Sequence, residues 1–222
     1  QPVLGEFEAE YLSLPKEVLI TVMKKHQRYF PVENKTSGDL LNNFVTFANG
    51  PCDVSAVKSG NEAVLRARYQ DAKFFYENDC KESLETLRPK LEGITFQTEL
   101  GSMLQKTERA ENLAPKVAAA LGYGDDASIV AMATKAARLA RADLASSMVM
   151  ELTSLAGVMG EHYAKKCDKL DDTTSKAIFE ANLPRFSGDL IASTAPGIVA
   201  TIADKADTLV GLFAVVGAPK AT

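Results

Sequence analysis

The first part of the chain mixes helical and strand-like patterns of apolar residues. After Leu14 and Pro15, apolar side chains recur three and four positions apart, which predicts a helix with the proline in its first turn. The segments RYFPV (28–32) and NNFVTFAN (42–49) are short, aromatic and β-branched, and they flank the polar stretch ENKTSGD. This arrangement predicts two strands joined at that turn. The apolar positions of the predicted helix are Val18, Leu19, Val22 and Met23.

From residue 60 onward the strong patterns are helical. The stretch GNEAVLRARYQDAKFFYEND (60–79) places apolar side chains on one helical face, which we expect to be buried. The stretch SLETLRPKLEG (83–93) predicts a shorter helix that bends or ends near Pro89, because proline lacks an amide donor and clashes with the preceding turn. The face of the first helix consists of Leu65, Tyr69, Ala72 and Tyr76.

Three further helical runs are predicted in the rear of the chain. Residues 97–121 form a run that is interrupted or restarted at Pro115. Residues 128–152 are rich in alanine and offer a narrow seam for close helix packing. The last run, near 196–216, follows candidate caps at Ser193 and Thr194, with Pro196 near its first turn. The seam is Ile129, Ala133, Ala136, Ala140 and Leu144, and the buried face expected for the last helix is Ile198, Ile202, Leu209 and Phe213.

These patterns predict a predominantly helical protein with two portions. Residues 1–92 read as an α+β portion, and residues 93–222 read as an all-helical domain. The 222 residues suffice for one large domain or for two small ones, each with its own core.

Composition and charge narrow the class of protein. With 46% hydrophobic and 24% charged residues, the chain has the composition of a globular protein and not of a disordered one. The net charge of −4 gives no general attraction to nucleic acid or membrane, so any anion-binding role requires a local basic patch. The longest apolar run without a charge, TLVGLFAVVGAP, has 12 residues, whereas a bilayer span needs about 20. We therefore expect no membrane partner.

The cysteines and the chain ends set two further expectations. Cys52, Cys80 and Cys167 are odd in number, scattered and outside any CxxC motif. They indicate free thiols in a reducing compartment, and neither a disulfide framework nor a zinc site. The sequence begins at Gln1 and stops in APKAT just after the last predicted helix. We expect it to be a segment of a longer protein, truncated at its C-terminal end.

Catalytic machinery is not indicated. The two histidines, His26 and His162, both lie beside positive charge, and we interpret them as surface or helix-end residues. The motifs GxSxG, HExxH, GxGxxG and the P-loop do not occur in the sequence. We assign no catalytic residue and no metal ligand.

Two helical stretches of the rear resemble a known superfamily. TIADKADTLVG (201–211) is similar to the last conserved helix of the HD superfamily of metal-dependent phosphohydrolases, and ARLARADLASS (137–147) resembles the helix that carries their His-Asp doublet. Here the doublet position reads Ala142-Asp143, and Asp204 stands at the other site. Such a site needs imidazole nitrogens as well as carboxylates. The resemblance therefore implies an HD-like domain with degenerate metal positions, in which Asp143 and Asp204 cap or bridge helices.

Basic residues give the remaining candidate surface. Arg66 and Lys73 are seven positions apart, so they share a helical face two turns from each other. Acidic residues are interspersed among the basic ones, so the set fits either an anion-binding surface or ordinary solvated helix faces. The candidate contacts to an anionic partner are Arg66, Arg68, Lys73, Lys106, Arg109 and Arg185.

A series of blocks in fixed order resembles the glycyl-tRNA synthetase β subunit, of the bacterial and organellar type that works with a separate or fused α subunit. The resemblance extends over nearly the whole chain. One departure is Ala63, where many bacterial members have a basic residue, and the overall look is closest to the plant and algal organellar branch. The blocks are LPKEVLITVMKKHQRYFPV, GNEAVLRARYQDAKFFYEND, ITFQTELGSMLQKTERAENLA, RADLASSMVMELTSLAGVMGEHYA, LPRFSGD and IADKADTLVGLF.

The resemblance implies a role without chemistry in this segment. In that family the α subunit carries the class II catalytic core, with ATP, magnesium and glycine, while the β subunit binds and positions tRNA(Gly). The resemblance implies that this segment binds no cofactor, contacts tRNA and the α subunit in an assembly of two α and two β subunits, and contains an HD-like domain. It implies an organelle, the plastid stroma or the mitochondrial matrix, with the bacterial cytoplasm as the alternative. An HD-type metal-dependent phosphohydrolase and a purely structural helical scaffold remain open as other functions.

Overall fold

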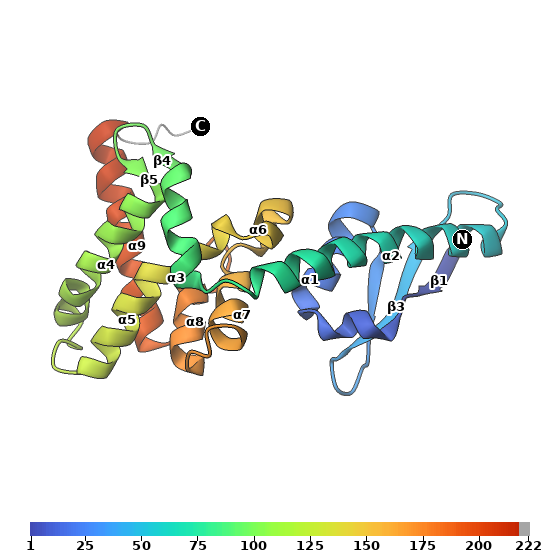
Figure 1. The fold of residues 1–222 in the computed structure, drawn as a ribbon, viewed down its shortest axis with the longest axis horizontal. Helices are drawn as coiled ribbons and strands as arrows, with labels where there is room; N and C mark the ends of the chain where they lie inside the picture. The colour runs from blue at the N-terminus through green and yellow to red at the C-terminus, as the bar shows by residue number, and fades with distance from the viewer. Residues whose placement is uncertain (218–222) are drawn as a thin grey trace. The chain divides into compact units, whose positions relative to one another are not determined.

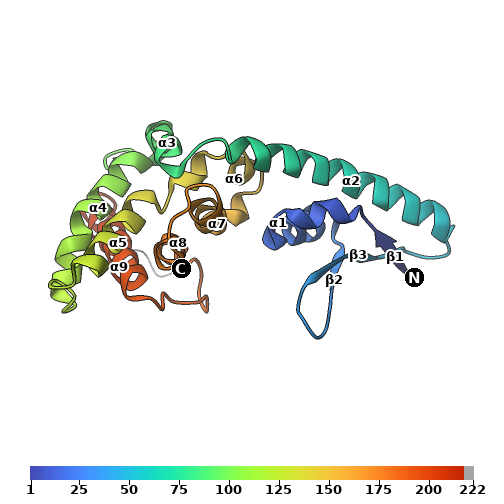
Figure 2. The same ribbon diagram turned by 60° about the horizontal axis from the view of Figure 1, so that its bottom comes forward.

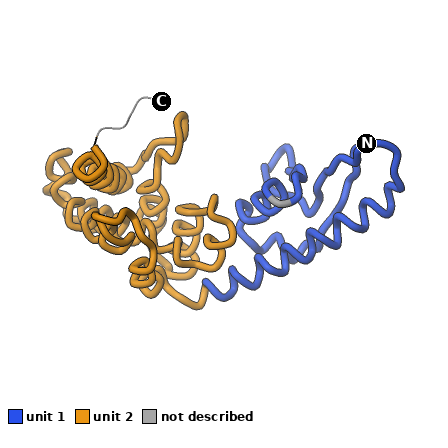
Figure 3. The backbone as a smooth tube through the Cα atoms, turned by 90° about the horizontal axis from the view of Figure 1, so that it is seen from above, with its two compact units in different colours: residues 1–79 blue, residues 80–222 orange. Residues whose placement is uncertain are grey.

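The computed structural model describes residues 1–217, apart from the side chain of His26. Packing divides the chain into unit 1, Gln1–Asp79, and unit 2, Cys80–Thr222 (Figure 3). The sequence placed the boundary between the two portions after residue 92. In the structure, residues 80–92 belong to the second compact unit, because α3 (Leu84–Leu87) and the 3₁₀ turn η3 (Arg88–Gly93) pack against its helices.

Unit 1 is a three-stranded antiparallel sheet with helices along one face. The strand order is β1-β3-β2, and Leu4 of β1 and Phe30 of β2 both lie opposite Val45 of β3. The long helix α2 runs beside β1 (Figure 1). The predicted pair of strands is confirmed, and β1, which the sequence patterns did not single out, extends their sheet. The elements are β1 (Pro2–Glu6), η1 (Ala9–Ser13), α1 (Lys16–Thr21), the π-helical η2 (Val22–Gln27), β2 (Phe30–Glu33), β3 (Leu40–Phe47) and α2 (Val54–Asp79).

The core of unit 1 is aromatic. The ring of Tyr69 is fully buried and lies edge-on to Phe7, with ring centroids 5.0 Å apart. The ring of Phe44 stacks on Tyr29 with centroids 4.7 Å apart, and a Cβ at Gly5 would collide with Phe44, so only glycine lets β1 approach this closely. The predicted buried face of α2 is confirmed: Leu65, Tyr69, Ala72 and Tyr76 are all buried.

Unit 2 is a bundle of helices with one small hairpin. Helices α4, α5 and α9 pack against one another, and α8 packs against α5, α7 and α9 (Figures 1 and 2). Within residues 1–217, no helix combines the length and the apolar character that crossing a bilayer requires. After α3 and η3 the elements are β4 (Thr95–Gln97), β5 (Gly101–Ser102), α4 (Met103–Ala120), α5 (Ala127–Leu139), η4 (Ala142–Ala145), α6 (Ser147–Glu151), η5 (Thr153–Leu155), α7 (Val158–Lys166), α8 (Asp172–Glu180) and α9 (Ala195–Val215).

Two expectations about the rear are wrong around residues 95–121. The rear is not entirely helical, because β4 and β5 form a hairpin before α4. Gly101 has φ +85°, and Ser102 then forms a capping box with Gln105, so the helix begins at Met103 and not at residue 97. Helix α4 also runs through Pro115 without interruption. Its neighbours Ala114 and Ala118 are fully buried, and this packing offsets the backbone hydrogen bond that proline removes.

The alanine-rich run 128–152 is not one helix. Helix α5 ends at Leu139, and Ser146 caps the separate helix α6 by accepting from the amide of Val149. The expected seam is therefore confirmed only within and just after α5, where Ala133, Ala136 and Ala140 are buried.

The expected buried face of α9 is wrong. Leu209 is 58% exposed and Phe213 is 48% exposed, and Ile202 is also exposed. The buried side consists instead of Val199, Ala200, Ala203 and Asp204, since small residues allow close approach to α4, α5 and α8 and the aspartate has cationic partners there. The predicted cap is confirmed, because Thr194 accepts from the amide of Gly197.

Candidate functional site

Asp204, which the sequence predicts as a degenerate HD position, lies at the centre of a buried ion-pair network between α4 and α9. Lys106 on α4 is 3% exposed, and its Nζ lies 3.0 Å from Asp204 Oδ1 and 3.3 Å from Asp207 Oδ2. Arg141 lies 2.9 Å from the other Asp204 oxygen. Arg109 holds Asp207 with two nitrogens, at 2.6 and 3.3 Å. Every carboxylate in this network is shared between cations, which satisfies the requirement that buried charges be paired.

The electrostatics of Asp204 follow from this geometry. Burial disfavours its charged form and would raise its pKa, but the nearby charges of Arg141 and Lys106 outweigh that effect. The net result is a pKa below the ordinary value for aspartate, so Asp204 stays ionised as an ion-pair partner. Lys106 also donates to the Asp204 carbonyl and to the hydroxyl of Thr208, which uses all three of its donors.

Asp143, the other position predicted to be degenerate, caps a helix. It is 1% exposed, and its Oδ2 accepts from the amides of Gly157 and Gly160 at 2.6 and 2.9 Å, at the start of α7. Among the residues that the structure describes, its Oδ1 has no hydrogen-bond partner. Burial raises the pKa of Asp143 to about 6, although the two amides and Arg141 act in the opposite direction. Ala142, where the HD pattern has histidine, is fully buried and apolar.

The two aspartates have different partners. Asp204 is held by Lys106 and Arg141, whereas Asp143 is held by backbone amides of α7. Both carboxylates are therefore engaged by protein donors, and within residues 1–217 no cluster of three or more histidine, cysteine, aspartate or glutamate side chains is arranged to hold an ion. The arrangement can stabilise the bundle, because the buried charges are paired and the start of α7 is capped.

The candidate cations of unit 1 lie on α2. Arg66 pairs with Glu8, and Lys73 lies 3.0 Å from Glu10, so the two share one side of the helix and both face η1 and the residue before it. Arg68 is exposed on another side, with no ion-pair partner among residues 1–217. The pKa of Glu8 is lowered by hydrogen bonds from the backbone amide of Glu8 and from the side chain of Arg66. Arg66 and Lys73 thus connect α2 to the chain leading from the sheet.

The candidate cations of unit 2 are also paired. Lys106 is buried in the network described above. Arg185 forms two hydrogen bonds with Asp189, at 2.8 and 3.1 Å, and its guanidinium lies over the rings of Phe179 and Phe186. The pKa of Asp189 is lowered chiefly by these bonds. Arg185 therefore stabilises the loop between α8 and α9, which contains both Arg185 and Asp189.

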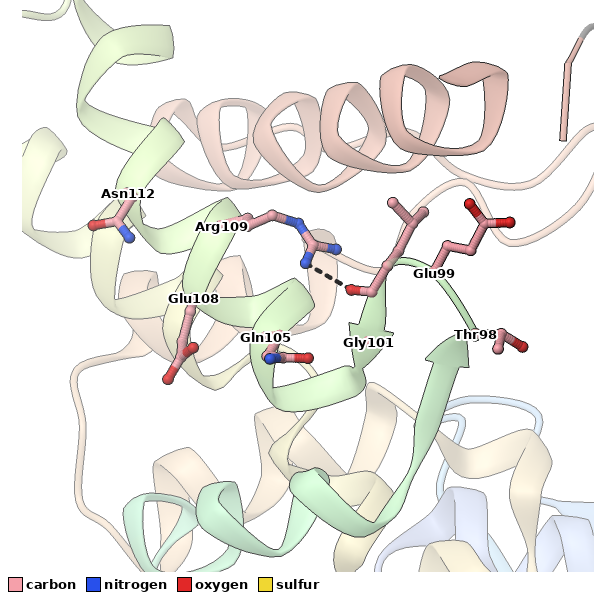
Figure 4. A pocket seen from close by; sticks show the side chains of 8 residues that line it. Thr98, Glu99, Gly101, Gln105, Glu108, Arg109 and Asn112 are labelled. Atoms are coloured by element: carbon pink, nitrogen blue, oxygen red, sulfur yellow. Dashed lines mark hydrogen bonds between the residues drawn. The ribbon is translucent and has the colours of Figure 1, made fainter. Parts of the chain in front are cut away.

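Arg109 borders a surface hollow of about 520 Å³ between α4 and the β4–β5 hairpin. Figure 4 shows its side chain reaching toward the hairpin, where it donates to the carbonyl of Leu100 at 3.0 Å. Glu99 and Glu108 also line the hollow. With Arg109 already paired to Asp207, the charge of this hollow disfavours a phosphate group.

The structure also contains an exposed basic segment that was not among the anion-binding residues predicted from the sequence. Lys24 and Lys25 are exposed on the π-helical η2, and Arg28 follows at its end with φ +56°. None of these three side chains has a hydrogen-bond or ion-pair partner among residues 1–217. Phe30, 56% exposed, comes two residues later and lies edge-on to Phe47, which is 63% exposed. The sequence signal was present in KKHQRYF, three cations within five residues that contain no acidic residue.

Comparison with known proteins identifies the family. The family model described as glycyl-tRNA synthetase beta subunit matches residues 1–222. The chain belongs to the glycyl-tRNA synthetase β-subunit family. The resemblance inferred from the ordered sequence blocks is thereby confirmed.

Individual relatives of this glycyl-tRNA synthetase β-subunit chain come from bacteria and from a plant. It is 45% identical over 221 residues to the chloroplastic/mitochondrial glycine–tRNA ligase 2 of Arabidopsis thaliana, covering 100% of this chain and 20% of that protein. It is 46% identical over 212 residues to the glycine–tRNA ligase β subunit of Clostridioides difficile, covering 95% of this chain and 30% of the relative. The β subunit of Marinobacter nauticus is 44% identical over 222 residues, which is 31% of its length. The chain thus spans less than a third of these relatives.

Proposed function

We propose that this chain is a non-catalytic part of a glycine–tRNA ligase, which binds and positions tRNA(Gly) and contacts the α subunit. Membership of the β-subunit family supports this assignment. The complete enzyme would use ATP and magnesium to activate glycine at the α subunit, whereas this segment would hold no cofactor. Positioning tRNA toward an active site elsewhere can lower a reaction barrier by about 7–11 kcal/mol through orientation alone.

The observation that carries the tRNA proposal is the unpaired basic segment formed by Lys24, Lys25 and Arg28. A phosphate that binds here need not displace a carboxylate, because none of the described residues pairs with these cations. RNA is recognised through its phosphates, 2′-hydroxyls and shape, and exposed aromatic rings can stack on unpaired bases. We therefore propose Lys24, Lys25 and Arg28 as contacts to the tRNA backbone.

The earlier candidates contribute differently to this proposal. Arg68 is retained as an exposed cation of α2 that has no ion-pair partner within residues 1–217. Arg66, Lys73, Arg109 and Arg185 are partly exposed, so each remains a proposed contact only where RNA replaces its carboxylate partner. Lys106 is no longer proposed as an RNA contact, because its ammonium group is buried and uses all its donors internally.

The test uses the complete two-subunit enzyme with the β-subunit change K24Q/K25Q/R28Q. We expect a higher KM for tRNA and weaker tRNA binding, with the slope of log K against log salt concentration reduced by about three. Glycine activation without tRNA, measured by ATP–pyrophosphate exchange, should be unchanged, because we assign that step to the α subunit.

The matched control is K116Q/K166Q/K169Q, which removes three exposed lysines of unit 2 and the same formal charge. We expect the control to retain the wild-type salt slope. Equal slopes in the basic-segment variant, the control and the wild type would exclude the basic segment as an RNA contact.

Contact with the α subunit rests on the family, whose members are named as β subunits. We propose that the chain takes part in an assembly of two α and two β subunits. Light scattering of the co-expressed subunits, with and without the region matching residues 1–222 of this chain, tests the proposal. An assembly that forms equally well without this region would contradict it.

A scaffold function is favoured by one specific observation: the pairing of Arg66, Lys73, Lys106, Arg109 and Arg185 with carboxylates. If these residues act only in packing, R66Q/K73Q will lower the unfolding midpoint without changing tRNA binding. If they also contact RNA, the slope of log K against log salt concentration will fall as well.

We also propose that residues 93–222 contain an HD-like helical domain without hydrolase chemistry. The use of Asp143 as a helix cap and of Asp204 as an ion-pair partner supports this assignment. Stoichiometric bound metal together with nucleotide hydrolysis by the purified protein would contradict it. We propose an organelle as the site of action, with the bacterial cytoplasm as the alternative, and imaging of a fluorescent fusion in the source organism distinguishes them.

A further inference from the structure

Two of the three cysteines of this chain meet in unit 2. The Sγ atoms of Cys80 and Cys167 lie 2.8 Å apart, and both residues are half-buried, so small reagents can reach them. Cys80 directly follows Asp79, the last residue of α2, and Cys167 ends α7. They are 87 positions apart in the chain, so no local sequence pattern brings them together.

The backbone around both cysteines is held in place. The amide of Leu84, at the start of α3, donates to Asp168 Oδ2 at 3.0 Å, which ties the segment after Cys80 to the segment after Cys167. At the end of α7, the amides of Asp168 and Leu170 donate back to the carbonyls of Tyr163 and Ala164. The thiols are therefore neighbours because two bonded segments meet, and a disulfide requires the two sulfurs to approach from 2.8 Å to about 2.05 Å.

We propose that Cys80 and Cys167 are a reversible redox-modification site, which forms an intramolecular disulfide by exchange with a low-molecular-weight disulfide of the glutathione class. This goes beyond the proposed tRNA-binding function and does not depend on it. It also refines the expectation that all three cysteines are isolated free thiols, since two of them are paired neighbours in the reduced protein.

The exchange balances in two steps. The Cys80 thiolate attacks one sulfur of the oxidised reagent, which forms a mixed disulfide and releases one thiolate of the reagent. The Cys167 thiolate then attacks Sγ of Cys80, which forms the intramolecular bond and releases the second thiolate. The protein loses two protons and two electrons, and the reagent disulfide is reduced to two thiols.

The geometry also assigns the order of attack. The thiol of Cys167 donates to the sulfur of Cys80, so the proton of Cys167 is engaged between the two sulfurs. Burial, together with this hydrogen bond, raises the pKa of the Cys167 thiol to about 12. Cys80 is therefore the attacking residue and Cys167 the resolving one.

Cys52 provides a control within the same chain. It is half-buried like the other two, lies before α2, and has no sulfur neighbour among residues 1–217. A reagent that reaches Cys52 can form only a mixed disulfide there, whereas Cys80 and Cys167 can lose both reagent halves and become linked. The two outcomes differ in peptide mass.

The experiment exposes the complete glycine–tRNA ligase to defined ratios of oxidised to reduced glutathione, followed by acid quench, alkylation and peptide mass spectrometry. We expect the Cys80 and Cys167 peptides to appear as one linked pair that dithiothreitol separates. We expect the linked form to accumulate at a ratio about tenfold or more below that needed to modify Cys52, because the second step is intramolecular. The urea midpoint should rise on oxidation in the C52S variant and should not rise in C167S.

Two serine variants test the order of attack. C167S should accumulate glutathione on Cys80, because the resolving thiol is missing, whereas C80S should leave Cys167 largely unmodified. C52S should form the linked pair as the wild type does. The proposal is overturned if Cys80 and Cys167 remain separate, reduced or each carrying glutathione, at ratios that fully modify Cys52. Equal modification of Cys80 in C167S and of Cys167 in C80S would overturn the assigned order.

Discussion

Replacing Asp204 by asparagine removes one negative charge from the ion-pair network while keeping the shape of the side chain. The carboxylate is almost completely buried and lies about equally close to Lys106 and Arg141, at 3.0 and 2.9 Å. In the variant, two cations between α4, α9 and η4 lose their shared partner. We therefore expect a large loss of folding stability.

The magnitude follows from the surroundings of each cation. Removing one partner of a buried ion pair typically costs about 3–5 kcal/mol, because the other charge remains buried. Lys106 keeps Asp207 at 3.3 Å, and the Arg141 side chain is 20% exposed, so water compensates part of the loss. We expect the lower end of that range, about 3 kcal/mol. For a urea m value of about 2 kcal/mol/M, the midpoint should fall by about 1.5 M.

Urea unfolding at pH 7, followed by circular dichroism, measures this difference. The matched control is Glu82→Gln, which removes one carboxylate from the exposed pair with Lys90 and should cost about 0–1 kcal/mol. Because the pKa of Asp204 is lowered in the folded protein, its contribution is present above the ordinary pKa and is lost as pH falls through the lower folded value. A loss in D204N no larger than in E82Q would refute the reasoning, and so would a loss that stays constant down to pH 2.

The remaining predictions concern two other buried residues. Tyr69→Ala should lower the free energy of unfolding by about 3–5 kcal/mol, because the ring is fully buried against Phe7 and Tyr11, whereas Tyr69→Phe should cost about 1 kcal/mol for the bond to the Leu19 carbonyl. Near-zero loss in Tyr69→Ala would contradict this packing. The pKa of Asp143 is raised to about 6, so the folded protein disfavours the charged form of this residue. The contribution of Asp143 to stability is therefore full below pH 4 and is lost as pH rises through about 6. Asp143→Asn should remove up to about 3 kcal/mol of pH dependence between pH 4 and 6, measured as the difference in unfolding free energy from wild type; an unchanged difference across that range would contradict it.

Several elements could be derived from the sequence because their patterns are local. Apolar residues at helical spacing identified the buried faces of α1 and α2, and short runs of β-branched and aromatic residues identified β2 and β3. Thr194 was recognised as a cap because capping needs only a side-chain oxygen close to the first amides of the helix. Family membership was also determined by the sequence, since ordered blocks along the chain carry it.

Other features depended on partners distant in the chain. Hydrophobicity alone assigned the wrong face of α9 to the core, because the pairing of Asp204 with Lys106 and Arg141 is absent from the local pattern. In the same way, only the fold showed that Lys106 is buried while Lys24 and Lys25 are free of carboxylate partners among the described residues.

The sequence by itself therefore determined which segments become helices or strands and to which family the chain belongs, because both depend on the order of residues along the chain. Tertiary structure decided which charges are neutralised, which buried carboxylates pair with cations or cap a helix, and which two thiols meet. Coulomb interactions, desolvation and thiol exchange act through distances in space, and residues such as Cys80 and Cys167 become neighbours only when the bundle has formed.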